Sequence, residues 1–131
     1  MDLNFLKIID EKREMLDGIA DELWEFAETA YKEFKSAGRL CQALREEGFQ
    51  VEEGLAGIPT AFCGKYGTGR PVIGILGEFD ALEGLGQAAG VVEKRPNGRK
   101  SGHGCGHNLL GTGALGAALA VKRFLETSGH A

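Results

Sequence analysis

The feature that most constrains the fold is a continuous apolar run, residues 72–77, that ends in two carboxylates. A turn-forming segment at residues 67–71 precedes the run, and Glu78 and Asp80 follow it. A short run of this kind is typical of a strand buried on both faces, as in the sheet of an α/β protein. Open α/β sheets bind their ligands beyond the carboxyl ends of the strands. We therefore predict an α/β fold with Glu78 and Asp80 at a functional sheet edge.

The first half of the chain carries the pattern of amphipathic helices. Between residues 3 and 30 the apolar spacing predicts one long helix or two joined helices. A second helix is expected over residues 36–47, with Ser36 as its N-cap and Gly48 as its C-terminal stop. The apolar stripe of the first helical segment consists of Leu16, Ile19, Ala20, Leu23 and Ala27.

The second half of the chain holds most of the 21 glycines, which predicts tight turns and close backbone approaches. Residues 49–51 are expected to form a short strand or a connection, and residues 58–66 are expected to form a strand. Residues 83–104 show no periodicity and are expected to form a long loop. A last helix is expected to end near Thr127. The 131 residues suffice for one domain, with helices packed on a partial mixed or parallel sheet.

Composition and charge exclude several classes of function. The net charge is −4 and the charges are mixed along the chain, so we expect no nucleic-acid partner. No apolar run approaches the roughly 20 residues that span a bilayer, so we expect no membrane partner. The N-terminus lacks the features of a signal peptide. The cytoplasm is therefore the expected location. Three widely spaced cysteines do not form a disulfide framework, and reduced thiols fit that location.

The residues most suggestive of chemistry are His103, Cys105 and His107, which alternate with two glycines. Alternate side chains of an extended segment point to the same side. A thiolate and neutral imidazoles suit zinc and similar transition metals. We predict Cys105 and His107 as metal ligands, with His103 as a third. The alternative is a glycine-rich turn whose histidines are exposed or only hydrogen-bonded.

Glu78 and Asp80 also share one side of an extended strand end. They are candidates for metal ligands, for carboxylates that orient a ligand, or for an acid–base group. Asp80 is our candidate catalytic-site residue, because a carboxylate often orients a metal-binding imidazole. The alternative is a solvated strand end without a function.

Residues 111–116 match the Gly-x-Gly-x-x-Gly fingerprint of dinucleotide-binding proteins. That fingerprint must directly follow a strand, whereas here the histidine and cysteine cluster precedes it. Small residues that pack a helix closely on a sheet are the simpler interpretation.

Four stretches together resemble the metallopeptidase family of aminoacylases, carboxypeptidase-G-like enzymes and N-acyl amino acid amidohydrolases. They run in the family's order, nearly span the chain, and comprise residues 24–30, 57–62, 77–82 and 102–111. The resemblance implies that residues 1–131 are an N-terminal fragment of a zinc-peptidase-like catalytic domain. The dimerisation domain and the C-terminal half would then be absent.

The resemblance also implies specific roles. Cys105 takes the bridging position that an aspartate fills elsewhere in the family, His107 is a ligand, and Asp80 orients rather than binds. Glu78 replaces the histidine of the family's His-x-Asp motif. Two divalent metals, zinc or manganese, serve a complete site. The implied substrate is a small N-acyl amino acid such as p-aminobenzoyl-glutamate.

The family's catalytic Glu-Glu pair and its later ligands are absent from these residues. The expectation is therefore a truncated chain, inactive alone, that forms a homo-oligomer or joins a partner subunit. The competing hypothesis is a metal-binding module or partner subunit without catalysis.

Overall fold

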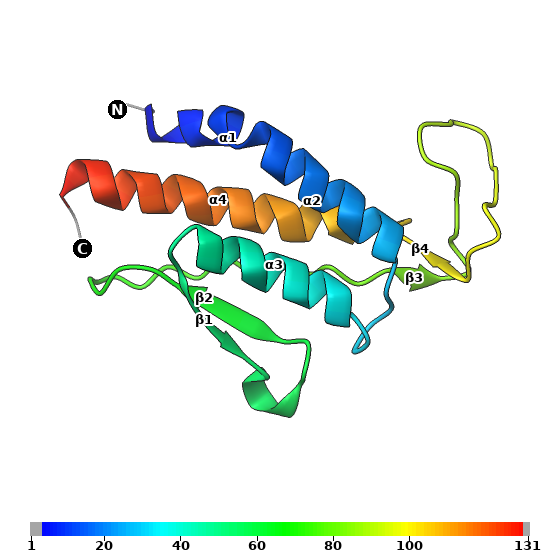
Figure 1. The fold of residues 1–131 in the computed structure, drawn as a ribbon, viewed down its shortest axis with the longest axis horizontal. Coiled ribbons are helices and arrows are strands. Elements are labelled where there is room, and N and C mark those ends of the chain that lie inside the picture. The colour runs from blue at the N-terminus through cyan, green and yellow to red at the C-terminus, as the bar shows by residue number, and fades with distance from the viewer. Residues whose placement is uncertain (1–3, 130–131) are drawn as a thin grey trace.

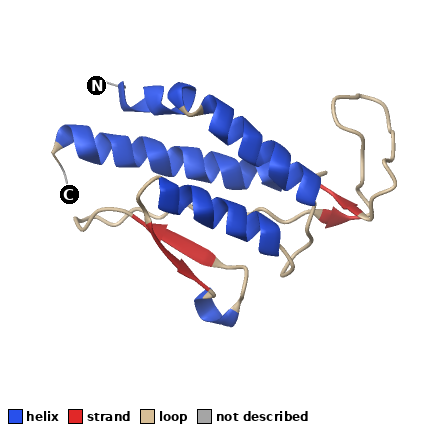
Figure 2. Ribbon diagram, viewed as in Figure 1, coloured by secondary structure: helices blue, strands red, loops and turns tan. Residues whose placement is uncertain are grey.

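The computed structural model describes residues 4–129, in which long helices pack together and short strands flank them (Figures 1 and 2). Both ends of the described chain lie near the C-terminal end of the longest helix (Figure 1). The helices in chain order are η1 (Asn4–Leu6), α1 (Lys7–Glu11), α2 (Arg13–Phe26), α3 (Phe34–Glu46), η2 (Leu55–Gly57) and α4 (His107–Ser128). The strands are β1 (Gln50–Glu53), β2 (Phe62–Lys65), β3 (Leu82–Glu83) and β4 (Ser101–Gly102).

The core lies where α2, α3 and α4 meet. Every member of the predicted stripe of α2 and its end is buried, and Ile19 and Leu23 are fully enclosed. Leu115 and Leu119 of α4 complete this core. Each such aliphatic side chain contributes roughly 1.5–3 kcal/mol when it is fully buried. The helical periodicity is therefore a sound guide to the core, although Leu3, where the first helix was expected to begin, lies outside the described residues.

The junction between α2 and α3 differs from the prediction in detail. The first helical segment ends at Phe26 rather than near residue 30, because Ala27 adopts a left-handed conformation with φ 43°. Ser36 is not an N-cap but a buried residue of the first turn of α3. The Glu28 carboxylate caps this helix instead, accepting hydrogen bonds from the backbone N–H groups of Lys35 (3.1 Å) and Ser36 (2.9 Å).

Helix α3 ends as predicted, and an antiparallel hairpin follows it. Gly48 has φ 85°, and its N–H donates to the Arg45 carbonyl at 3.0 Å. Strands β1 and β2 pair antiparallel, with Val51 opposite Gly64. The strand predicted over residues 58–66 shortens to β2, because a turn in which the Ala61 N–H donates to the Ile58 carbonyl occupies its start.

The apolar run at residues 72–77 is not the doubly buried strand that its sequence predicts. Val72, Ile73 and Leu76 are 81, 71 and 87% exposed. Among the described residues, no backbone–backbone hydrogen bond involves residues 72–80. The physical reason is that no described strand lies beside the run to form a ladder with it. Only its end, beginning at Gly77, is held against α4.

The second sheet is small, and its two strands lie at the two ends of the predicted loop. Strands β3 and β4 pair antiparallel, and the loop between them projects from the helices (Figure 1). Gln87 organises this loop through hydrogen bonds with Glu93, Arg95 and Asn97. One parallel bridge joins Thr29 to Ala81. The described fold is thus α/β, with two antiparallel pairs in place of a larger parallel sheet.

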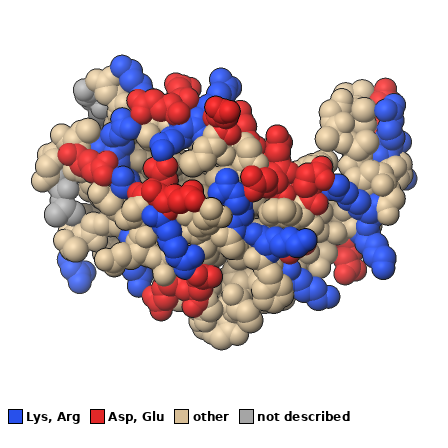
Figure 3. Space-filling model, in the orientation of Figure 1, with Lys and Arg blue, Asp and Glu red and all other residues tan. Residues whose placement is uncertain are grey.

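The surface carries charges of both signs. On the face shown in Figure 3, lysines and arginines alternate with aspartates and glutamates over the helices, without an extended region of one sign. Several of these charges are paired across elements, for example Arg123 of α4 with Glu11 of α1 at 2.9 Å. Within residues 4–129, no helix is both long and apolar enough to cross a membrane.

Candidate metal centre

The candidate centre forms where the end of the apolar run crosses the start of α4. The backbones approach so closely that a Cβ atom added at Gly111 would lie 3.0 Å from the Phe79 Cβ and 3.3 Å from the Glu78 carbonyl oxygen. A Cβ atom at Gly77 would lie 2.8 Å from the Ala114 Cβ. Glycine at both positions therefore lets the segment that carries the carboxylates rest directly on the helix.

Contacts on both sides fix the carboxylate segment. The Phe79 ring packs beside the Phe62 ring of β2, with centroids 5.6 Å apart. The Ala81 N–H donates to the Glu28 carbonyl at 2.7 Å, beside the end of α2. Because Phe79 packs on the hydrophobic core, its two neighbours, Glu78 and Asp80, are directed together toward His107.

Glu78, Asp80 and His107 form a group whose potential ligand atoms all lie within 4.8 Å of one another. The Asp80 Oδ1 lies 2.7 Å from the His107 Nδ1, and the Glu78 Oε2 lies 3.3 Å from the His107 Nε2. The side chains of His107 and Asp80 are 18 and 23% exposed, whereas that of Glu78 is 61% exposed. The centre is thus anchored on one side and open to solvent on the other.

This donor set fits a divalent metal. When the His107 Nδ1–H donates to Asp80, the Nε2 of the neutral ring keeps its lone pair for a cation. The Glu78 carboxylate, facing that same Nε2, adds an oxygen ligand and negative charge. Imidazole and carboxylate together suit zinc and manganese. Two carboxylates and an imidazole are therefore in place around one point.

The structure does not bring the other predicted ligands into this group. The Cys105 side chain is exposed in the turn before α4, and its sulfur is not among the mutually close atoms. His103 is buried, and both of its ring nitrogens face the protein backbone. Its Nε2 lies 3.0 Å from the Leu23 carbonyl oxygen, and its Nδ1 lies 3.3 Å from the Asn108 backbone nitrogen.

The sequence does not assign one role to Glu78, a member of this group, or any role to Asn108, which follows His107. The pattern leaves Glu78 between several roles, and the structure groups it with Asp80 and His107. Asn108 is buried, and its side-chain amide donates to the Ala20 carbonyl at 3.1 Å. Its position directly after His107 is the only signal in the sequence. The glycines of residues 111–116 lie inside α4, so they form no phosphate-binding loop.

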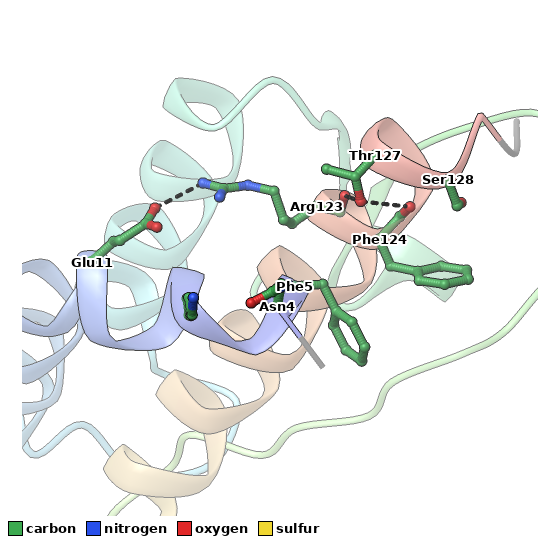
Figure 4. Close-up of a pocket in the computed structure, with 8 residues that line it drawn as sticks. Asn4, Phe5, Glu11, Arg123, Phe124, Thr127 and Ser128 are labelled. Atoms are coloured by element: carbon green, nitrogen blue, oxygen red, sulfur yellow. Dashed lines mark hydrogen bonds and ion pairs between the residues drawn. The ribbon is translucent and has the colours of Figure 1, made fainter. Parts of the chain in front are cut away.

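A hollow lies at the end of α4 opposite to the candidate centre (Figure 4). Its walls come from η1, α1 and the last two turns of α4, and the Arg123 and Glu11 side chains form an ion pair at its edge. The Phe5 and Phe124 rings meet edge to face with centroids 5.6 Å apart. Helix α4 runs from His107 to Ser128, so roughly 30 Å separates this hollow from the centre.

The chain is similar to several curated hydrolases and peptidases, although no family model matches it. It is 48% identical over 123 residues to one of the subunits of the p-aminobenzoyl-glutamate hydrolase of Escherichia coli, covering 93% of this chain and 26% of that protein. It is 29% identical to the Xaa-Arg dipeptidase of Mus musculus, covering 91% of this chain and 26% of that protein. It is 31% identical to the thermostable carboxypeptidase 1 of Saccharolobus solfataricus, covering 95% of this chain and 32% of that protein.

The chain thus spans between a quarter and a third of the length of these relatives. The matches nonetheless extend over nearly all of its own residues, including the segments that carry Glu78, Asp80 and His107. The family suggested by the four sequence stretches is also the family of the relatives. Nearly all of this chain is thus similar to one part of proteins from the metallopeptidase and amidohydrolase family.

Proposed function

We propose that this chain carries part of the metal centre of an amidohydrolase that cleaves the amide bond of an N-acyl amino acid. The observation that carries the proposal is the convergence of Glu78, Asp80 and His107. It occurs in a chain 48% identical to part of a p-aminobenzoyl-glutamate hydrolase. p-Aminobenzoyl-glutamate is therefore the reference substrate.

Each residue of the centre has a distinct proposed role. His107 binds the metal through Nε2, and Asp80 holds the ring in place by accepting the Nδ1–H hydrogen bond. Glu78 supplies a carboxylate ligand. A divalent metal held by these residues would polarise the substrate carbonyl and would lower the pKa of a water molecule. The exposed side of Glu78 is where an amide substrate would approach.

Cys105 is proposed as a further ligand that joins the centre on metal binding. The thiol lies in a turn bounded by glycines, two residues before His107. A thiolate ligand would favour zinc, whereas a centre of carboxylates and one imidazole also suits manganese. Cobalt(II) distinguishes the two cases, because a thiolate ligand gives a charge-transfer absorption that Cys105→Ser removes.

We propose that the isolated chain does not complete catalysis. A catalytic zinc uses about three protein ligands, and a two-metal site needs more. The chain covers 26% and 32% of two of its relatives, so they hold residues with no counterpart here. The missing ligands and the general base would come from another polypeptide segment. The exposed apolar residues at 72–76 offer a surface for a second copy or a partner subunit.

The three free cysteines support a cytoplasmic location as part of this proposal.

Metal titration tests the centre directly. Calorimetry with Zn²⁺ and Mn²⁺ should show binding to the unmodified chain, with binding abolished by His107→Gln. Asp80→Asn should weaken binding by about 10–100-fold, because it removes the carboxylate that orients the ligand ring. Glu83→Gln, which removes an exposed carboxylate three residues beyond Asp80, is the matched control and should bind like the unmodified chain. Equal affinities in all four proteins would contradict the proposal.

Hydrolysis of p-aminobenzoyl-glutamate tests the claim that the chain is inactive alone. The isolated chain with added zinc or manganese should give no turnover above background. Turnover that Cys105→Ser abolishes would show instead that these residues suffice for catalysis. A chain that binds metal tightly and never supports hydrolysis, even with its partner, would point to the alternative of a non-catalytic metal-binding module.

A further inference from the structure

His103, which its spacing marks as a ligand, is placed by the structure in a different role. It is 5% exposed and lies beneath the turn that precedes α4. A carbonyl oxygen can only accept, so the contact with the Leu23 oxygen at 3.0 Å requires a hydrogen on Nε2. The Nδ1 then accepts from the Asn108 N–H at 3.3 Å. Both nitrogens of the neutral ring are satisfied, and neither lone pair is left for a metal.

The ring joins the end of α2 to the start of α4. Its Nε2 bonds to the last full turn of α2, and the Trp24 ring lies beside it with centroids 6.4 Å apart. Asn108 makes a second link one turn earlier, to the Ala20 carbonyl.

The same residue also shapes the turn that presents the candidate ligands. The His103 carbonyl accepts from the Gly106 N–H at 3.1 Å, which closes a tight turn around Cys105. Gly106 has φ 79°, and its carbonyl accepts from the Leu109 and Leu110 N–H groups in the first turn of α4. His107 is the first residue of that helix. The direction of the His107 ring therefore depends on where the turn is fixed.

We propose that His103 is a positioning residue, which locks the turn onto α2 and thereby holds His107 and Cys105 for metal binding. This inference rests on the proposed metal centre, but its first consequence does not require a metal. By fixing the turn, His103 should maintain the hydrogen bond between the His107 Nδ1–H and Asp80, which spans 2.7 Å.

Three variants separate positioning from coordination. His103→Gln keeps an N–H donor that can reach the Leu23 carbonyl. His103→Ala removes both bonds, and His103→Asn, a milder change should the alanine variant fail to fold, retains only the contact near the Asn108 N–H. His107→Gln is the reference for the loss of a true ligand.

The first measurement is proton NMR without metal, following the hydrogen-bonded Nδ1–H of His107. This signal should persist in His103→Gln and disappear or broaden in His103→Ala and His103→Asn. The second measurement is Zn²⁺ titration with the cobalt(II) spectrum. His103→Ala should lose about 10–100-fold in affinity, whereas His103→Gln should retain both the affinity and the spectrum of the unmodified chain.

Two outcomes would overturn the inference. In one, His103→Gln loses the metal as fully as His107→Gln, which would make His103 a ligand. In the other, His103→Ala lowers stability but leaves the His107 signal and the affinity unchanged, which would make His103 a purely structural residue. If the unmodified chain binds no metal, the proposed function fails, and the NMR comparison alone decides the role of His103.

Discussion

Replacing Gly111 by alanine tests whether the close contact between the carboxylate segment and α4 sets the geometry of the metal centre. The added Cβ would lie 3.0 Å from the Phe79 Cβ and 3.3 Å from the Glu78 carbonyl oxygen. Both neighbours must move by a few tenths of an ångström, and the second is backbone. Gly113, two residues further along the same helix, has nothing within 4 Å of the position of its Cβ.

The two alanine variants form a matched pair. Each gains about 0.5–1 kcal/mol from the lower conformational entropy of alanine in the unfolded chain and its better helix propensity. That gain cancels in the comparison. The remaining difference is the cost of overpacking at residue 111, which is about 1–3 kcal/mol. We expect Gly113→Ala to be more stable than the unmodified chain and Gly111→Ala to be less stable than Gly113→Ala by that amount.

Urea denaturation measures the stabilities, and Zn²⁺ titration measures the effect on the centre. Because the shift moves the segment that carries Glu78 and Asp80 away from His107, Gly111→Ala should also bind zinc more weakly. Gly113→Ala should bind zinc like the unmodified chain. Equal stability and equal affinity in the two variants would refute the idea that this contact sets the geometry.

Further predictions concern the core and the exposed run. Burial raises the pKa of the Cys41 thiol from 9.0 to about 11, so the folded state favours the neutral thiol. The resulting contribution of Cys41 to the free energy of unfolding is fully present below pH 9, and on the order of 2–3 kcal/mol is lost as the pH rises to 11. Urea melts of Cys41→Ala should show a smaller loss, and an equal loss would contradict the assignment. Ile73→Lys should weaken self-association in sedimentation velocity, whereas Val92→Lys, at a fully exposed loop position, should not; a monomeric unmodified chain would count against pairing between copies. Leu23→Ala should cost about 2–5 kcal/mol in the free energy of unfolding, and Leu109→Ala, at a 64% exposed side chain, should cost far less.

The helices could be predicted because their signals are local. The stripe of α2 repeats within a few turns, and each of its members is buried. The N-cap of α3 could not be found in this way, because the capping carboxylate of Glu28 lies eight residues before Ser36. The exposure of residues 72–77 could not be predicted from the sequence either. An apolar run indicates that its residues are suited to burial, but a separate segment of chain would have to cover it.

The candidate centre was predictable where the backbone is extended and not where it turns. Glu78 and Asp80 alternate with Phe79 along an extended segment, and they do share one side. The same reasoning does not place His103 correctly relative to His107, because the backbone turns at Gly106 and α4 begins at the next residue. The alternation is interrupted, so His103 is directed into the protein and His107 toward the carboxylates.

Residues 72–80, which make no backbone–backbone hydrogen bond with any described residue, also matter during protein synthesis. This segment is synthesised before α4, the helix on which its end rests. At translation rates of about 5–20 residues per second, the 48 residues that follow Asp80 up to Ser128 take roughly 2–10 s to add. The valine, isoleucine and leucine side chains of residues 72–76 remain exposed after α4 has formed, so they are available to a chaperone during and after this interval. The yield of native protein should therefore depend on chaperone supply and growth temperature more than its small size suggests.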